Sequence, residues 1–258
     1  MKNVLITGAT RNTGFAAARL FAKEGYGVAI TGRDKERALA AANAIAYEFG
    51  VKTTGYGLDI TDTAEVERVF LQAEKDLGSI DVFVANSANL GIGCGTMNTT
   101  ESEFDGIVSA NVKGTFFCCR SAAKIMERHG GGSIVTVGSV QATGAVRGRC
   151  VYAMTKAAIS VLVKNLAFEL GEYGIRANNV VAGAIHTERW DGLSADELEK
   201  RRAKYPVGRE ATEEEIANAI YYLASEKAAS ITGIDLTVDS GISVCMLPYE
   251  KEKKDENN

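Results

Sequence analysis

The chain has 258 residues, with 29 Lys or Arg against 33 Asp or Glu, which gives a formal net charge of −4 at pH 7. This balance argues against nucleic acid or an anionic membrane as a partner, and no run of about 18 apolar residues would span a bilayer. A chain of this length can bury one sizeable core, so we expect a cytoplasmic protein with a single domain.

Short runs rich in β-branched residues alternate along the chain with longer segments of helical periodicity. Strands are predicted, in chain order, at residues 3–7, 27–31, 53–58, 80–86, 133–137, 176–181 and 235–238. Helices are predicted between them at residues 13–23, 34–48, 63–76, 101–128, 151–172 and 212–224. Residues 61–65 and 212–215 carry capping-box patterns. This alternation predicts a doubly wound, Rossmann-like parallel α/β sheet joined by right-handed crossovers.

Two stretches interrupt the alternation. Residues 184–211 form a polar, charged insertion that is too long for an ordinary connection, and we expect it to act as a lid over a substrate site. Within it, His186 and Trp190 are expected to pack or to shape the lid. Residues 250–258 are almost all charged or amide, which predicts a frayed tail after a domain that spans residues 1–249.

Cysteine and histidine are the residues that would indicate metal or disulfide chemistry. The chain has 5 cysteines and 2 histidines, and no two cysteines stand in a C-x-x-C spacing. An odd number of cysteines without metal-ligand spacing is typical of reduced thiols in a cytosolic protein. We therefore predict no metal site.

Residues 7–14, with the sequence TGATRNTG, lie between the first predicted strand and the first predicted helix. A glycine turn that leads into a helix N-terminus presents free backbone N–H groups to a pyrophosphate, so we interpret this loop as a phosphate site. Asn12 is the kind of non-glycine residue that best tolerates a left-handed backbone. Alternatively, Gly8 merely ends the strand and Gly14 merely lets the helix approach the sheet.

The loop resembles the T-G-x-x-x-G-x-G motif of the short-chain dehydrogenase/reductase family. Thr7, Gly8 and Gly14 match the motif, and Asn12 replaces its middle glycine. The resemblance extends over roughly residues 3–243. It implies that the cofactor is bound by the loop residues Gly8, Thr10, Arg11, Asn12, Thr13 and Gly14.

A second motif strengthens the resemblance. Tyr152-Ala-Met-Thr-Lys156 matches the Y-x-x-x-K of the family, and Ser139 stands 13 residues before the tyrosine. Asn111, in the sequence SANVKG, occupies the position of the helical asparagine of the family. These four residues are similar to the complete catalytic tetrad of the family.

The chemistry of carbonyl reduction explains why these residue types are needed. A carbonyl that accepts hydride needs a proton donor, but a phenol with a pKa of about 10 is poorly matched to neutral pH. A lysine at i+4 faces the tyrosine, so we expect Lys156 to lower the pKa of Tyr152 toward the working range. The resemblance implies that Lys156 also holds the nicotinamide ribose, and that Asn111 holds a water for proton relay. Ser139 would donate a hydrogen bond to the substrate oxygen.

Other positions that resemble the family are expected to contact the cofactor. Asp59 corresponds to the adenine-contacting aspartate, although an aspartate before a helix can also be a simple cap. Thr187 stands where the family contacts the nicotinamide amide. Both Asn86 and Gly183 are retained from family motifs, whereas their neighbours depart from the pattern at Ala85, Ser87, Ala88 and Ala182.

The residues after the second strand bear on the choice between NAD and NADP. NAD-selective relatives carry an acidic residue at the end of that strand, which accepts hydrogen bonds from the ribose hydroxyls. Here the strand is followed by Arg33 and Asp34. Arg33 together with Arg11 could clamp a 2′-phosphate, so we predict that NADP(H) is preferred over NAD(H). The alternative is that Arg33 is solvated and Asp34 caps the next helix.

The combined pattern predicts an oxidoreductase that transfers hydride between NADP(H) and a ketone or secondary alcohol. The substrate could be a 3-oxoacyl thioester, a hydroxysteroid or a sugar or polyol. Arg147 and Arg149 could recognise an anionic group on it, or could face solvent or another subunit. Residues 231–241 resemble the C-terminal strand that family members bury in oligomer interfaces, which implies a homotetramer or homodimer.

Two other classes of function fit the sequence less well. A non-catalytic dinucleotide-binding redox sensor would be expected to lack the active tyrosine or lysine, and this chain has both. A hydrolase on a similar sheet would need a G-x-S-x-G elbow and a late histidine with an acidic partner. Ser139 lacks the second glycine of that elbow, because Gln141 stands there.

Overall fold

A central parallel sheet organises the computed structural model, which describes residues 1–187, 190 and 192–245. The sheet has seven strands in the order β3-β2-β1-β4-β5-β6-β7, and all of its pairings are parallel. The strands are β1 (Asn3–Ile6), β2 (Gly27–Gly32), β3 (Thr53–Gly57), β4 (Val82–Ala85), β5 (Gly132–Ser139), β6 (Ile175–Ala182) and β7 (Asp235–Val238). The predicted doubly wound sheet is confirmed. The predicted tail at residues 250–258 lies outside the described residues.

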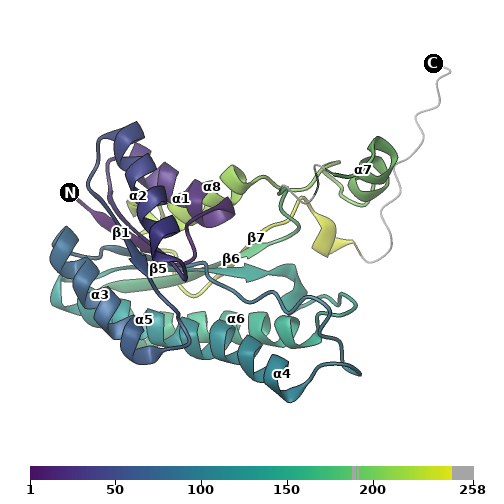
Figure 1. Cartoon of the computed structure of the whole chain (residues 1–258), viewed down its shortest axis with the longest axis horizontal. Coiled ribbons are helices and arrows are strands. Elements are labelled where there is room, and N and C mark those ends of the chain that lie inside the picture. Colours follow the sequence, from purple (N-terminus) through teal and green to yellow (C-terminus); the bar gives the residue numbers. More distant parts are fainter. Residues whose placement is uncertain (188–189, 191, 246–258) are drawn as a thin grey trace.

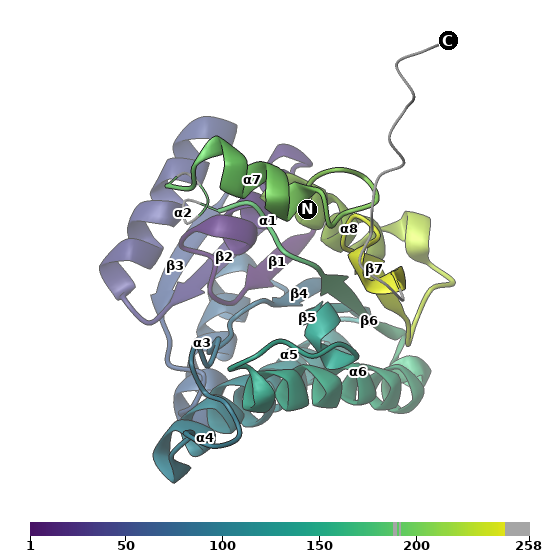
Figure 2. The ribbon, with the colours of Figure 1, turned by 90° about the vertical axis from the view of Figure 1, so that its right-hand side faces the viewer.

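Helices cover both faces of the sheet, as Figures 1 and 2 show from two directions. One hydrophobic core joins α1, α2 and α8 to the sheet, and a second core joins α3, α5 and α6 to the opposite face. The helices are α1 (Asn12–Lys23), α2 (Lys35–Phe49), α3 (Thr63–Leu77), α4 (Glu101–Val108), α5 (Thr115–Arg128), α6 (Cys150–Leu170), α7 (Ala195–Arg202) and α8 (Glu213–Ala224). Because both faces are covered, the central strands β1 and β4 are buried along their whole length.

The strand order fixes where a ligand can bind. The chain leaves β1 toward β2 and β3 on one side, and returns to β4, β5, β6 and β7 on the other side. A crevice therefore opens at the carboxyl ends of β1 and β4, which is the switch point where doubly wound sheets bind their ligands. The glycine loop follows β1, so the topology places it in this crevice.

The predicted helix at residues 101–128 is interrupted. It consists of α4, a π-helix at Ser109–Gly114, and α5. At the end of the π-helix, a Cβ on Gly114 would lie 2.7 Å from the carbonyl oxygen of Ile60, so the chain passes very close to the segment after β3. A π-turn adds a residue to the helical turn and re-aims the side chains within it, and such turns recur at functional sites. Periodicity alone does not reveal this change.

Of the two predicted capping boxes, one forms. Thr212 and Glu215 bond reciprocally at the start of α8. At α3 the cap is Asp62, which accepts from two backbone N–H groups, while Glu65 accepts from the backbone N–H of Asp59, which lies outside the box. The prediction of a reciprocal box at residues 61–65 is wrong, because the backbone N–H of Asp62 donates to the Asp59 carbonyl oxygen at 3.1 Å and not to Glu65.

The insertion before α8 contains a helix that the sequence analysis did not predict. Ser194 and Glu197 form a capping box at the start of α7, so an S-x-x-E pattern was the available signal. A backbone pairing between Ile185 and Ala211 closes the base of the insertion. Figure 1 shows α7 beyond the two helical layers, on the side of the molecule where β6 and β7 end.

One helical stretch in the described part of the chain, Cys150–Tyr173, is long and apolar enough to span a membrane by length and composition. It comprises α6 and the turn that follows it. Ile159, Val163 and Leu166 of this stretch are buried in the core that also contains α3 and α5. Packing in this core therefore accounts for part of its apolar character.

Candidate active site

The glycine loop adopts the backbone that a phosphate cradle requires. Gly8 has a φ of +64° and Asn12 a φ of +53°, so the expectation that asparagine takes the left-handed position of a glycine is confirmed. A Cβ on Gly14 would lie 2.7 Å from the Gly8 carbonyl oxygen and 2.8 Å from the Ala9 Cα. Only glycine lets the start of α1 come this close to the loop.

Asn86, at the end of β4, holds the glycine loop in place. Its amide nitrogen donates to the carbonyl oxygens of Thr7 at 3.1 Å and Gly8 at 2.9 Å. In return, the Thr7 hydroxyl accepts from the backbone N–H groups of Asn86 at 3.1 Å and Ser87 at 3.3 Å. These bonds join the ends of β1 and β4 across the crevice, and they use none of the side chains that depart from the family pattern.

The end of β2 lies against the glycine loop. The backbone N–H of Ala9 donates to the Thr31 carbonyl oxygen at 3.1 Å. A Cβ on Gly32 would lie 2.6 Å from a methyl carbon of Thr10. Arg11 follows Thr10 in the sequence and Arg33 follows Gly32, and both arginines are exposed.

The acidic residues near this point are engaged locally. Asp34 caps α2 by accepting from the backbone N–H of Arg37 at 3.0 Å, so that part of the alternative interpretation is confirmed. Asp59 accepts from the backbone and the hydroxyl of Thr61 at 2.9 and 2.8 Å. These bonds lower the pKa of Asp59, and the charge of Arg33 contributes in the same direction. Arg33 therefore lies within electrostatic reach of Asp59.

The four residues of the predicted tetrad come from three segments. Ser139 ends β5, Tyr152 and Lys156 lie on the first turns of α6, and Asn111 lies on the π-helix. Their exposed fractions are 8%, 8%, 6% and 2% respectively. The Lys156 ammonium donates to the Val137 carbonyl oxygen at 2.6 Å and lies 5.6 Å from the centroid of the Tyr152 ring. The fold thus brings a buried phenol, a hydroxyl and a lysine to the carboxyl end of β5.

The pKa of Tyr152 departs from the expected direction. Burial raises it above the usual value for a phenol, and a hydrogen bond with Ser139 and the charge of Arg149 only partly oppose this effect. The expectation that Lys156 brings the pKa down to the working range is corrected, because desolvation of the phenol dominates. Burial also lowers the pKa of Lys156 to about 8.

Asn111 joins two segments through its side-chain amide. Its oxygen accepts from the backbone N–H of Asn89 at 2.7 Å. Its nitrogen donates to the Asn89 carbonyl oxygen at 2.9 Å and to the Thr155 hydroxyl at 3.0 Å. The amide therefore ties the loop after β4 to α6 at Thr155, the residue that precedes Lys156. Its predicted part in a proton relay stays a prediction.

Of the two arginines before Tyr152, Arg149 is held in place. Its guanidinium donates to the Leu90 carbonyl oxygen and lies 5.9 Å from the centroid of the Tyr152 ring. Both Arg147 and Arg149 line a groove of about 990 Å³ that also includes Met154 of α6. Met154 lies on a face of α6 turned away from Tyr152, and none of the tetrad residues lines the groove.

Gly183 and Thr187 follow β6 on the same edge of the sheet. The Gly183 backbone N–H donates to the Val238 carbonyl oxygen at 3.0 Å, and a Cβ on Gly183 would lie 2.7 Å from the Cβ of Asp239. This close approach explains why glycine is needed after β6. Thr187 lies four residues further on and is partly buried.

The insertion contains a buried ion cluster that the sequence analysis missed. The Glu210 side chain is 3% exposed, accepts two hydrogen bonds from Arg202 at 3.0 and 2.8 Å, and lies 2.7 Å from the His186 ring nitrogen. These bonds, chiefly those from Arg202, lower the pKa of Glu210 to about 2. The sequence offered no signal, because a glutamate in a charged segment is usually solvated.

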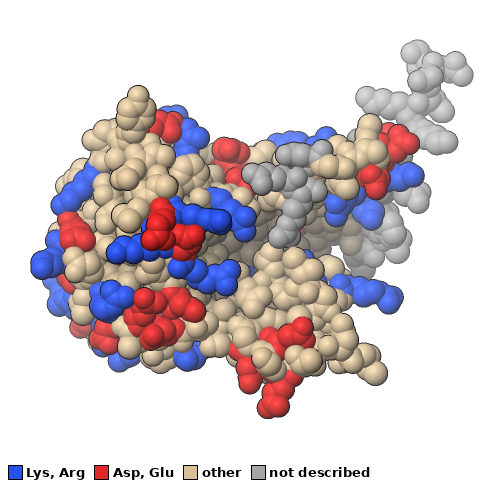
Figure 3. All heavy atoms as spheres, viewed as in Figure 1, with Lys and Arg blue, Asp and Glu red and all other residues tan. Residues whose placement is uncertain are grey.

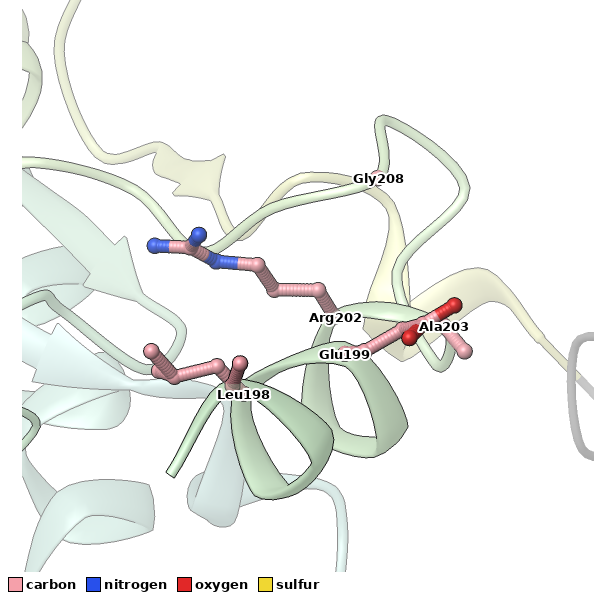
Figure 4. Close-up of a pocket in the computed structure, with 6 residues that line it drawn as sticks. Leu198, Glu199, Arg202, Ala203 and Gly208 are labelled. Carbon is pink, nitrogen blue, oxygen red and sulfur yellow. The ribbon is translucent and has the colours of Figure 1, made fainter. Parts of the chain in front are cut away.

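Arg202 also lines a pocket of about 430 Å³ on α7, where it projects to the same side of the helix as Leu198 and away from Glu199 (Figure 4). Trp190 is 7% exposed and packs under the guanidinium of Arg201, 4.5 Å from the ring centroid. The contacts of Arg201 and Arg202 therefore join parts of the insertion to one another. His186 and Trp190 pack in it as expected.

No group of three or more His, Cys, Asp or Glu residues could hold a metal ion within residues 1–187, 190 and 192–245. The five cysteines are free thiols, and three of them (Cys94, Cys118 and Cys119) are buried.

Figure 3 shows acidic and basic side chains interspersed on the visible face, and a hollow between the α7 segment and the helices below it.

Comparisons with known proteins agree with this geometry. Residues 8–243 match a family model described as enoyl-(acyl carrier protein) reductase. The chain is 34% identical over 239 residues to a 3α-hydroxysteroid dehydrogenase of Mediterraneibacter gnavus, covering 92% of this chain and 95% of the relative. It is 34% identical over 242 residues to a 3-oxoacyl-(acyl-carrier-protein) reductase of Staphylococcus aureus, with coverage of 93% and 98%.

A solved structure of a 7α-hydroxysteroid dehydrogenase, in complex with NADH and 7-oxo glycochenodeoxycholic acid, superposes with a TM-score of 0.86 at 32% identity. The superposition covers 93% of each chain. The likeness therefore includes the whole sheet and both helical layers.

Proposed function

Because the chain belongs to the short-chain dehydrogenase/reductase family, whose members act on CH–OH and C=O groups with NAD(P), we propose that it transfers hydride between NADP(H) and a ketone or secondary alcohol. The observation that carries the proposal is the buried set of Ser139, Tyr152 and Lys156 at the carboxyl end of β5, on the edge of the sheet that also carries the glycine loop. A sensor would not need a buried, protonated phenol there.

The chain's own residues fit a dinucleotide. The left-handed turn at Gly8 and Asn12, the close approach at Gly14 and the start of α1 suit a pyrophosphate. Asn86 would hold the cradle, Asp59 would contact the adenine, and the segment with Gly183 and Thr187 would hold the nicotinamide end. When bound, the nicotinamide supplies or accepts the hydride.

Tyr152 would donate the proton to the carbonyl oxygen in reduction. Because its pKa is raised, the phenol is protonated at neutral pH and able to act as the acid. Ser139 would donate a hydrogen bond to the same oxygen, where negative charge develops. Lys156 would bind the ribose hydroxyls and would carry its positive charge below a pKa of about 8. Asn111 would support a proton relay on the side of the π-helix.

Two exposed arginines support the preference for NADP(H). Arg11 and Arg33 follow a pair of residues, Thr10 and Gly32, that are in contact. A 2′-phosphate between the two guanidiniums would be bound by charge-assisted hydrogen bonds. The Asp34 carboxylate is directed to the start of α2, where it accepts the backbone N–H of Arg37.

The named relatives support a hydroxysteroid or a 3-oxoacyl thioester as substrate, with a sugar or polyol as a third class.

We propose a homotetramer or homodimer, because α6 carries an exposed apolar stripe of Met154, Val161 and Phe168. We also propose that residues 1–249 form one catalytic domain, with the insertion as a lid, in the cytoplasm.

The test is a panel of 3-oxoacyl thioesters, steroid ketones and keto sugars, assayed by NADPH absorbance with NADH in parallel. Turnover of one class with wild-type protein is expected. Tyr152→Phe should bind NADPH, measured by fluorescence, and should lose most of the turnover, because only the acid is removed. Retained turnover in Tyr152→Phe would contradict the assignment of the acid. NADPH binding without turnover of any class would favour the sensor.

A further inference from the structure

Two cations lie near the ring of Tyr152. One is Lys156, which the tetrad already includes, and the other is Arg149, whose guanidinium carbon is 5.9 Å from the ring centroid. At this distance a cation interacts favourably with an aromatic face, and more strongly with a phenolate. Arg149 is not part of the tetrad, and the proposed function gives it no role.

The position of Arg149 is fixed by two independent contacts. Its guanidinium donates to the Leu90 carbonyl oxygen in the loop after β4, and its backbone pairs with Cys94 in the same loop. It is also the residue immediately before α6, so it stands at the N-terminus of the helix that carries Tyr152. A side chain held in this way presents its charge to the phenol in a constant geometry.

The two cations respond differently to pH. Lys156 is buried, and its pKa is lowered to about 8, so its charge is lost as the pH rises through that value. The guanidinium of an arginine stays charged throughout the working range. Above pH 8, Arg149 is therefore the cation near the phenol that persists.

We propose that Arg149 is a positioning residue for Tyr152, which holds the loop after β4 against α6 and supplies a permanent positive charge that favours the phenolate. This inference rests on the proposed function, because the phenolate is the base that an alcohol oxidation requires. It adds a residue to the site that the tetrad does not contain.

Three polar or charged side chains lie near Tyr152. Ser139 at the end of β5 contributes a hydroxyl, Lys156 on α6 an ammonium, and Arg149 immediately before α6 a guanidinium. The loop after β4 approaches with Gly91, which is uncharged: a Cβ there would lie 3.7 Å from the Tyr152 Cβ. The hydrogen bond with Ser139 and the charge of Arg149 both lower the pKa of the phenol, against the effect of burial.

The variants separate charge from hydrogen bonding. Arg149→Gln removes the charge but keeps an N–H donor for the Leu90 carbonyl, whereas Arg149→Lys keeps the charge. Arg147→Gln is the matched control, because it removes a charge from an exposed arginine two residues away. Each protein is labelled with ¹³Cζ-tyrosine and titrated by NMR. The resonance of Tyr152 is assigned by its absence in Tyr152→Phe.

The midpoint of Tyr152 is expected to rise by about one pH unit in Arg149→Gln, the lower end of the range for losing an opposite charge at this distance. It should stay near the wild-type value in Arg149→Lys and Arg147→Gln. An unchanged midpoint in Arg149→Gln, or an equal rise in Arg147→Gln, would overturn the proposal. These titrations need no turnover, so they are independent of whether a substrate has been found.

A second measurement needs no variant of Arg149. In wild-type protein the ¹⁵Nε shift of Arg149 should titrate with the midpoint of Tyr152, and this step should vanish in Tyr152→Phe. If the step persists in Tyr152→Phe, the guanidinium senses another group and the proposal is wrong. Once a substrate is known, the rising limb of the alcohol-oxidation pH profile should move to higher pH in Arg149→Gln, with a several-fold loss at pH 7 that is regained at alkaline pH.

Discussion

Asn12 and Arg33 illustrate how single residues shape the proposed cofactor site. Asn12 takes a left-handed backbone, with a φ of +53°, that the family motif reserves for glycine. Arg33 follows β2 at the point where relatives that use NAD carry an acid, and its charge reaches Asp59. The first residue keeps the loop in shape, and the second is the residue that we propose selects NADP(H).

Arg33→Ala should raise the Michaelis constant for NADPH by roughly tenfold or more and that for NADH much less, since a charge-assisted bond to the 2′-phosphate is lost. Initial rates with both cofactors measure this. Arg37→Ala is the control, because Arg37 is an exposed arginine on α2 that pairs with Asp34. Equal effects of Arg33→Ala on both cofactors would remove the assignment of NADP(H).

Helix α8 depends on a residue of β6 for hydrogen bonds at its C-terminal end. The C-terminal carbonyl groups of a helix have no partner within the helix. Arg176 supplies partners for these carbonyl groups. Its guanidinium donates to the carbonyl oxygens of Leu223 at 2.7 Å and of Ala224 and Ser225 at 3.2 Å. It also donates to the carbonyl oxygen of Ile231 at 3.1 Å. A single side chain thus joins the end of α8, the segment before β7 and the sheet.

Arg176→Met should lower the free energy of unfolding by about 2–3 kcal/mol, because four carbonyl groups lose a charged donor. Urea denaturation of the apo protein measures the loss. Arg19→Met is the comparison, since Arg19 forms an exposed ion pair with Glu48 and should cost less than about 1 kcal/mol. Similar losses for both variants would show that the capping of α8 contributes little.

An ion cluster joins the two ends of the insertion to α7, and its charged groups come together only when the chain folds. Arg202 of α7 and His186 after β6 both bind the carboxylate of Glu210, which lies just before α8. Because the pKa of Glu210 is lowered to about 2, the carboxylate stays ionised, and its bond to Arg202 persists, at every pH at which the protein would be assayed.

Considered as a whole molecule, the chain leaves apolar surface outside its two cores. Met154, Val161 and Phe168 are spaced by seven residues on α6 and are 55%, 59% and 89% exposed. A stripe of this kind is unusual on an isolated chain and is typical of a surface that another protein covers. A second copy of the chain is the partner that we propose.

The double variant Val161→Glu, Phe168→Glu should therefore lower the assembly state, because two charges would be buried in the contact. Light scattering after gel filtration measures the mass. Tyr47→Glu is the control, since Tyr47 is 95% exposed on α2, in the opposite helical layer. A wild-type protein that is monomeric, or a double variant with unchanged mass, would contradict an interface on this stripe.

Much of the fold and of the site follows from local patterns. The alternation of strand and helix determined the parallel sheet, and strand bounds differ from the predicted ones by at most two residues. The Y-x-x-x-K spacing placed Tyr152 and Lys156 on one side of a helix, and Ser139 at a strand end. These features depend on residues close in sequence, so the sequence alone was sufficient.

Only the tertiary structure decided the environment of those residues. It interrupted the predicted helix at the π-turn that carries Asn111, buried Tyr152 so that its pKa rises, and brought Leu90 to Arg149 and Arg202 to Glu210. Such contacts join residues that are far apart along the chain or on different elements. Desolvation and charge pairing depend on what surrounds a group in space, which no spacing of residue types in the sequence specifies.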